Sequence, residues 1–266
     1  MADQARPVWE IPYPRYGWAA PWPRCFEVAE VLSPEDWTLV GGLMVQLHLQ
    51  RAGIRTIRPT EDIDMVAHIE TDPNRLSKVQ GRLMTLGYVP KPPLPRGAAA
   101  HRFERGGSEV IDLMVADHAN TDPAPTLMGR PVVKVHGATG ALQRTVNSII
   151  ATDPDGTTHS IISVPNSIAA LGLKAAAYID DRRDTRRHLD DAISLAATIA
   201  DPVAEARFLR GHDRGRIRRI WAHLQDPDHP SWLTLDPEHI PAARSALSIL
   251  TQKTQGLTDV RRLGLT

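Results

Sequence analysis

The chain has 266 residues, and its 31 lysines and arginines balance 31 aspartates and glutamates, so a nucleic-acid partner would have to use a local patch of charge. A single cysteine, Cys25, excludes an internal disulfide, and no apolar run approaches the ~20 residues that span a bilayer. The N-terminus lacks the apolar core of a signal peptide, so a soluble cytoplasmic protein with no membrane partner is expected.

Residues 1–35 are expected to form an arm rich in proline and tryptophan. Residues 7–23 hold five prolines and three of the six tryptophans, and proline at this density disfavours regular structure. A short helix over residues 26–32 is expected to follow. The arm either packs its aromatic rings on the main domain or binds a partner.

Residues 36–164 are predicted to form an α/β core. Its expected strands cover residues 37–40, 62–69, 101–105, 109–115, 132–135, 146–151 and 159–164, and its expected helices cover residues 43–51 and 72–86. From residue 165 to 266 the chain is predicted to form a helical C-terminal domain. An α/β half followed by a helical half indicates an α+β fold, with a mixed sheet and flanking helices.

Two glycines and a pair of aspartates are the most informative residues of the core. Asp62 and Asp64 stand two apart in a predicted strand, so both side chains lie on one face. Two anions about 6 Å apart repel by roughly 2–3 kcal/mol at an effective dielectric of ~20, which favours a bound cation such as Mg²⁺ or Mn²⁺. Upstream, Gly41 and Gly42 can bring backbone N–H groups to a phosphate at a helix start. Together these features indicate a nucleoside triphosphate site.

A third acid lies in another apolar, β-branched strand. Asp112 interrupts the run from residue 109 to 115, and an ionised carboxylate among aliphatic side chains is costly unless it is paired or bound to metal. Asp112 is therefore predicted to complete the metal site with Asp62 and Asp64, and it is a candidate base for an incoming hydroxyl. The alternative is a core acid held in a salt bridge.

Several other polar residues each have two interpretations. Thr60 binds the triphosphate or stabilises the turn before the strand, and Arg58 neutralises phosphate charge or lies in solvent. An arginine-rich helical region near residues 207–219 is either a solvated face or a groove for a nucleic-acid backbone. In the second case Arg214, Arg216 and Arg219 would bind RNA.

Taken in order, these residues resemble the signature of the nucleotidyltransferase fold: two glycines, a short helix, Asp-x-Asp and a later strand aspartate. The run Leu39-Val40-Gly41-Gly42, with Arg58-x-Thr60-x-Asp62-Ile63-Asp64, resembles the AbiEii/AbiGii-type abortive-infection toxins. That branch includes the MenT nucleotidyltransferase toxins of mycobacteria. The resemblance covers roughly residues 36–200 and leaves the remainder unmatched.

The resemblance implies roles for two downstream residues. The branch carries a lysine and then an aspartate ahead of a leucine on a helix pair, matched here by Lys174 and by Asp191 before Leu195. Lys174 lies at the edge of its helix's apolar stripe, so it extends to water or, as the family implies, reaches the triphosphate. Asp190 is the alternative to Asp191, because the two acids flank the apolar face from opposite sides.

The implied activity is a metal-dependent transfer of a nucleoside monophosphate from a nucleoside triphosphate. The resemblance implies an RNA acceptor, such as the 3′ end of tRNA, a pyrimidine nucleotide, and a toxin neutralised by an antitoxin on a separate chain. The catalytic residues would be Asp62, Asp64, Asp112, Lys174 and Asp191, and the nucleotide would be bound by Gly41, Gly42, Arg58, Thr60 and Lys174.

Two alternatives remain open from the sequence. The first is an enzyme of the same fold that modifies a protein hydroxyl or a small molecule such as an aminoglycoside. The second is a nucleotide- or partner-binding module without catalysis. No Walker-A loop, Gly-x-Ser-x-Gly motif or zinc-binding cysteine spacing is present, so these other chemistries have no support.

Overall fold

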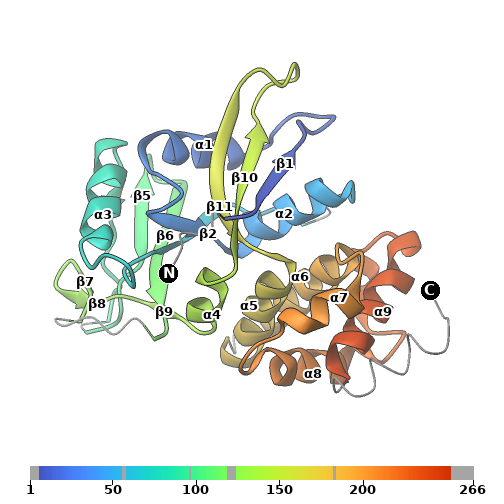
Figure 1. The fold of residues 1–266 in the computed structure, drawn as a ribbon. Coiled ribbons are helices and arrows are strands. Elements are labelled where there is room, and N and C mark those ends of the chain that lie inside the picture. Colours follow the sequence, from blue (N-terminus) through green and yellow to red (C-terminus); the bar gives the residue numbers. More distant parts are fainter. Residues whose placement is uncertain (1–5, 56–57, 96, 119–123, 182–183, 253–266) are drawn as a thin grey trace.

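The computed structural model describes residues 6–55, 58–95, 97–118, 124–181 and 184–252 (Figure 1). The first two thirds of the chain contain all the described strands with helices between some of them, and the helices α5 to α9 gather on one side of the sheets. The structure therefore has the predicted α+β composition. None of the helices in the described ranges is both long and apolar enough to cross a membrane.

The main sheet has the strand order β2-β3-β6-β5-β4, and the short strand β9 also pairs with β6. β3 and β6 run parallel, whereas the other neighbours along this path are antiparallel. The bounds are β2 Trp37–Leu39, β3 Asp62–Ala67, β4 Val89–Pro90, β5 Arg102–Arg105, β6 Glu109–Ala116 and β9 Lys134–Val135. The predicted strand over residues 132–135 is shorter than expected, and β9 covers only its second half.

A second sheet joins the N-terminal segment to a long hairpin. Strand β1 (Val8–Ile11) pairs in parallel with β10 (Thr145–Ala151), and β10 pairs antiparallel with β11 (His159–Pro165). A separate two-stranded ribbon contains β7 (Thr126–Leu127) and β8 (Arg130–Pro131).

The N-terminal segment differs from the expectation of irregular structure. Strand β1 lies between Pro7 and Pro12 at the edge of its sheet, a position that tolerates proline at its ends. Helix α1 (Trp22–Val31) begins four residues earlier than predicted, with Pro23 in its first turn, where a missing N–H costs nothing. The prolines therefore mark the ends of regular elements and do not forbid them.

The remaining helices include α4, which lies outside the predicted helices of the core. They are α2 Gly41–Ala52, α3 Arg75–Thr85, α4 Ala138–Leu142, α5 Ser167–Asp180, α6 Thr185–Ala197, α7 Pro202–Glu205, α8 Asp213–Leu224 and α9 Ile240–Thr251. Asn166 caps α5, since its side chain accepts a bond from the N–H of Ala169, and Asp201 caps α7 in the same way. Between α7 and α9, short 3₁₀ turns cover Ala206–Phe208, Pro230–Thr234 and Pro237–His239.

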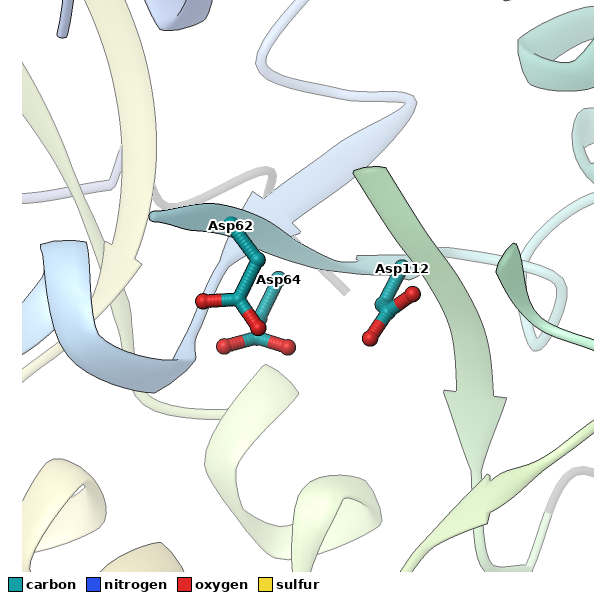
Figure 2. Close-up of side chains that lie close together, drawn as sticks. All are labelled: Asp62, Asp64 and Asp112. Carbon is teal, nitrogen blue, oxygen red and sulfur yellow. The ribbon is translucent and has the colours of Figure 1, made fainter. Parts of the chain in front are cut away.

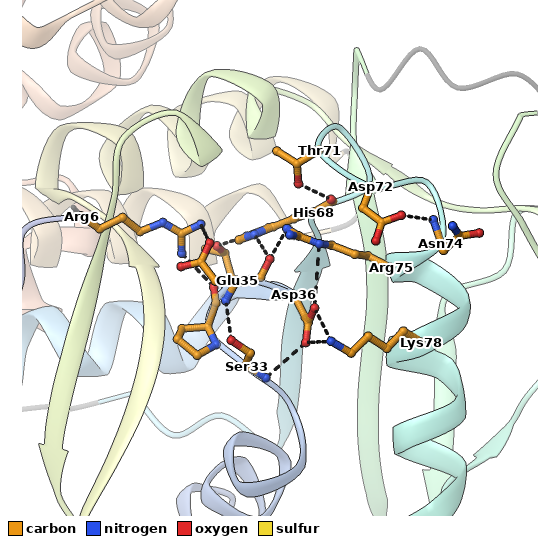
Figure 3. A network of polar contacts seen from close by, with 12 residues as sticks. Arg6, Ser33, Glu35, Asp36, His68, Thr71, Asp72, Asn74, Arg75 and Lys78 are labelled. Atoms are coloured by element: carbon orange, nitrogen blue, oxygen red, sulfur yellow. Dashed lines mark hydrogen bonds and ion pairs between the residues drawn. The ribbon is translucent and has the colours of Figure 1, made fainter. Parts of the chain in front are cut away.

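A polar network holds the far end of β3 in place (Figure 3). The imidazole of His68 contacts Thr38 Oγ1 at 2.6 Å and the carbonyl of Glu35 at 2.9 Å. Burial and the nearby Arg6 guanidinium lower the pKa of His68 to about 4, so this ring is neutral at physiological pH. Lys78 of α3 pairs with Asp36 at 2.7 Å. The network joins α3, β2 and β3, and it fixes the strand that carries the acidic pair.

Candidate active site

Two aspartates of β3 and one of β6 meet on one face of the main sheet (Figure 2). The parallel register places Asp64 beside Asp112 across the ladder, and Asp62 lies two residues earlier on the same face. One carboxylate oxygen from each of the three residues lies within 4.8 Å of the others. Ile63 and Met65, which alternate with the acids, are buried on the opposite face. The structure thus brings together the trio that the sequence predicts.

The proximity of the three carboxylates alters the ionisation of Asp64. Burial, followed by the negative charges of Asp62 and Asp112, raises the pKa of Asp64 to about 7. Such a cluster carries negative charge that the protein compensates only in part. Carboxylate oxygens are the ligands that Mg²⁺ and Mn²⁺ prefer, so the donor set fits a hard divalent metal.

Arg102 also belongs to this site, although sequence reasoning did not identify it. Its Nε and Nη2 donate to Oδ1 and Oδ2 of Asp112, both at 2.9 Å, and the two residues are paired in the β5–β6 ladder. This bidentate contact fixes the orientation of the Asp112 carboxylate. The signal was available: the predicted strands 101–105 and 109–115, paired outward from the three residues between them, place Arg102 opposite Asp112.

Gly41 and Gly42 begin helix α2 beside the acidic cluster. A Cβ on Gly41, whose φ is +69°, would lie 1.8 Å from Oδ2 of Asp64, and a Cβ on Gly42 would lie 2.6 Å from Oγ1 of Thr60. Thr60 in turn donates from Oγ1 to Oδ1 of Asp62 at 3.0 Å. Among the described residues, no side chain caps the N-terminus of α2, so its first N–H groups are available to an anion. Glycine is needed here because the acids and the helix start lie in contact.

Replacing Gly41 by alanine is expected to cost about 1–3 kcal/mol more in free energy of unfolding than replacing Gly53. Both glycines lie at ends of α2 with nearly equal angles, φ +69° and +70°, so the left-handed strain of about 1–2 kcal/mol is common to both. Of these two positions, only at Gly41 does the added Cβ meet another described residue, since no residue in the described ranges lies within 4 Å of the Gly53 position. Urea unfolding of both variants measures the difference, and equal losses would contradict the close approach to Asp64.

Arg58, Lys174 and Asp191 form an ionic group on the wall opposite the sheet, in which Lys174 and Asp191 are buried and Arg58 is partly exposed. Arg58 donates from Nε and Nη2 to Oδ1 and Oδ2 of Asp191, at 3.0 and 3.1 Å, and Lys174 Nζ lies 2.7 Å from Oδ2. Burial acts to raise the pKa of Asp191, but the two cations outweigh it and hold the pKa below its usual value. One carboxylate thus positions two cations. Asp190 does not line this cleft, so of the two candidate acids it is Asp191 that faces the site.

These groups line one cleft of about 1050 Å³ between the sheet and the helices α2, α5 and α6. Further basic side chains at its border are Lys91, Lys134 and Arg187. Binding sites for single small molecules span about 300–1000 Å³, so this cleft has room for a nucleotide and part of a second reactant.

The arginines proposed to bind RNA separate into two groups. Arg214 turns away from the cleft, and its Nη1 donates to the carbonyl of Leu250 at 2.9 Å and to that of Gln252. Arg216 and Arg219, on another face of α8, line a hollow beside the cleft. The sequence could not separate them, because the contact of Arg214 involves the end of a helix that lies far along the chain.

No protein-family model matches this chain, and no curated protein matches it. Among solved structures, it is similar to an antigenic nucleotidyltransferase-like protein from Paracoccidioides brasiliensis, with a TM-score of 0.47 and 15% sequence identity. The match covers 86% of this chain and 93% of that protein. A likeness this distant assigns no activity to this chain.

Proposed function

We propose that this protein is a metal-dependent nucleotidyltransferase that transfers a nucleoside monophosphate from a nucleoside triphosphate to an RNA hydroxyl. The observation that carries the proposal is the convergence of Asp62, Asp64 and Asp112 beside the uncapped, glycine-led start of α2. Three carboxylates within 4.8 Å of one another would hold Mg²⁺ or Mn²⁺. Bound there, the metal would neutralise charge on the attacking and leaving oxygens.

The chain's own residues suit the other requirements of this reaction. The free N–H groups of α2 would bind the β- and γ-phosphates. Lys174 and Arg58 lie on the same wall of the cleft, and because both pair with the single carboxylate of Asp191, the group has a net positive charge. Thr60 orients Asp62, and Arg102 orients Asp112. With both carboxylates held in place, most of the rate enhancement would come from positioning and charge neutralisation.

In the proposed step the acceptor hydroxyl oxygen forms a bond to the α-phosphorus, and the bond between that phosphorus and the leaving pyrophosphate oxygen breaks. Asp112 takes the hydroxyl proton. Lys174 and Arg58, which line the same cleft, would compensate the negative charge that develops on the departing pyrophosphate. Asp191 acts by positioning these two cations.

A toxin role is part of the proposal and rests on the resemblance of Gly41-Gly42, Thr60, Asp62-x-Asp64 and Lys174 to AbiEii-type toxins. The acceptor would then be RNA such as the 3′ end of tRNA, the nucleotide a pyrimidine, and an antitoxin would be a separate chain. Expression should slow cell growth, and Asp62→Ala with Asp64→Ala should relieve the effect.

The direct experiment incubates the purified protein with each α-labelled ribonucleoside triphosphate, Mg²⁺ and total RNA. We expect label in RNA with the wild type and none with the Asp62→Ala, Asp64→Ala variant. Label that resists ribonuclease and remains on protein, or enters a small molecule, would instead indicate the same chemistry on another acceptor. Equal labelling by wild type and variant, or none by either, would refute the proposal.

A further inference from the structure

A second hollow opens beside the main cleft and is lined by two arginines and two histidines. It encloses about 350 Å³, and we call it the basic hollow, lined by His136, Asp180, His212, Arg216 and Arg219. His136 and Asp180 border both the basic hollow and the main cleft. The two spaces are therefore adjacent, and a single-stranded RNA could extend from one to the other.

The two arginines of the basic hollow are available to an anion. Arg216 and Arg219 are three residues apart on α8 and so share a face of that helix. Within the described part of the chain, neither guanidinium forms an ion pair with an acid. By contrast, Arg214 and Arg218 of the same helix donate to the carbonyls at the end of α9.

The turn between β9 and α4 shapes the inner wall of the basic hollow. A Cβ on Gly137, whose φ is +84°, would lie 2.7 Å from Nη1 of Arg216, so the glycine leaves room for that guanidinium. Asp117 holds the same turn by accepting from the N–H of Gly137 at 2.8 Å. Next to it, Nδ1 of His136 contacts Oδ2 of Asp180 at 2.7 Å, which fixes the ring and leaves Nε2 as its second polar atom.

We propose that the basic hollow binds a backbone phosphate of the RNA acceptor, upstream of the hydroxyl that is modified. This inference rests on the nucleotidyltransferase proposed above. The triphosphate has its own cations, Lys174 and Arg58, on the α2 side of the main cleft. Arg216 and Arg219 do not border that cleft, so their charge serves a phosphate outside it. Because the whole chain carries no net charge, RNA affinity must come from such local contacts.

The test measures RNA binding without any nucleoside triphosphate, so it does not depend on catalysis. A fluorescent single-stranded RNA is titrated with wild type and with the Arg216→Gln, Arg219→Gln variant, between about 50 and about 200 mM salt. We expect the double variant to bind about tenfold more weakly. We also expect the slope of log affinity against log salt to become shallower by about 0.7 for each phosphate that the variant no longer neutralises.

A matched control removes the same charge from the same region. Arg207 and Arg210 are exposed, precede α8 and line neither the main cleft nor the basic hollow, so Arg207→Gln with Arg210→Gln should leave RNA affinity and salt slope unchanged. Unfolding curves of both variants establish that each is folded. Equal weakening by both pairs, or no weakening by Arg216→Gln with Arg219→Gln, would overturn the proposal.

The outcomes separate this inference from the proposed activity. If the wild type binds RNA through Arg216 and Arg219 but transfers no nucleotide, the assignment of the basic hollow as an RNA site is supported and the proposed nucleotidyltransferase activity is refuted. If the wild type labels a small molecule or protein and has no affinity for RNA, the basic hollow is not an RNA site even though the chemistry stands.

Discussion

Replacing Asp64 by asparagine is expected to lower nucleotidyl transfer by about a thousandfold or more. Asp64 lies at the centre of the acid trio, against Gly41 and paired across the ladder with Asp112. Charge stabilisation by a bound metal is worth several kcal/mol, and each 1.36 kcal/mol corresponds to about a factor of ten in rate. The measurement is the initial rate of label transfer with saturating Mg²⁺ and nucleotide.

The same substitution is expected to stabilise the protein when chelator removes divalent ions. The pKa of Asp64 is raised to about 7 in the folded protein, so the folded state binds a proton that the unfolded state has already released. Stability linked to this carboxyl is therefore fully present at low pH and is lost as the pH rises through about 7. Asp64→Asn keeps a neutral group at every pH, so its advantage over wild type should grow between about pH 5 and about pH 8.

Asp155→Asn is the matched control, because Asp155 is exposed in the turn between β10 and β11. It removes one negative charge far from the trio and should change neither the transfer rate nor the pH dependence of unfolding. A wild type whose stability is flat between about pH 5 and about pH 8, and an Asp64→Asn variant that follows it, would show that the three charges do not repel in the folded state.

The sequence predicted the acid trio because its geometry is local or nearly so. The two-residue period of a strand fixes the side on which Asp62 and Asp64 lie, and an acid inside an apolar strand identifies Asp112. Arg102 was missed although the predicted strands 101–105 and 109–115 place it opposite Asp112, because a partly exposed arginine in a strand has no distinguishing pattern of its own. On this wall of the cleft, the order of the strands and their hairpin register were therefore enough to place the acids and their arginine partner.

The opposite wall of the cleft could not be derived in this way. Arg58 and Asp191 are 133 positions apart, and no periodicity brings them together. Their contact depends on how α6 packs against α2, which is set by the whole core. The resemblance to a family singled out Lys174 and Asp191, but the sequence left the role of Arg58 open between phosphate and solvent. In the structure Arg58 has a specific acid partner.

The N-terminal segment shows a different limit of local reasoning. A count of prolines predicted irregular structure, but proline excludes a strand or helix only where its missing N–H or fixed φ conflicts with the element. Pro7 and Pro12 flank β1, and Pro23 lies in the first turn of α1, so none of them conflicts. The partner of β1 is β10, more than a hundred residues later, and only the tertiary structure reveals that pairing.

Removing the charge of Asp191 is expected to be the most destabilising single change in the cleft. Lys174 and Asp191 are 7% and 3% exposed, and Asp191→Ala would leave the ammonium of Lys174 buried without its partner 2.7 Å away. Breaking a buried ion pair from one side costs about 3–5 kcal/mol. We expect a loss of that size in the free energy of unfolding measured by urea denaturation. Asp190→Asn, a control at the neighbouring acid outside the cleft, should cost about 1 kcal/mol or less.

A double-mutant cycle separates the structural cost from the catalytic one. Lys174→Met alone leaves Asp191 paired with Arg58, so it should cost less stability than Asp191→Ala. Adding Lys174→Met to Asp191→Ala removes the unpaired ammonium and should restore part of the stability, whereas transfer activity should remain low because the cation is gone. Stability losses that simply add would show that the two side chains are not coupled. Recovery of transfer in the double variant would show that Lys174 does not serve the nucleotide, and that its pairing with Asp191 is structural only.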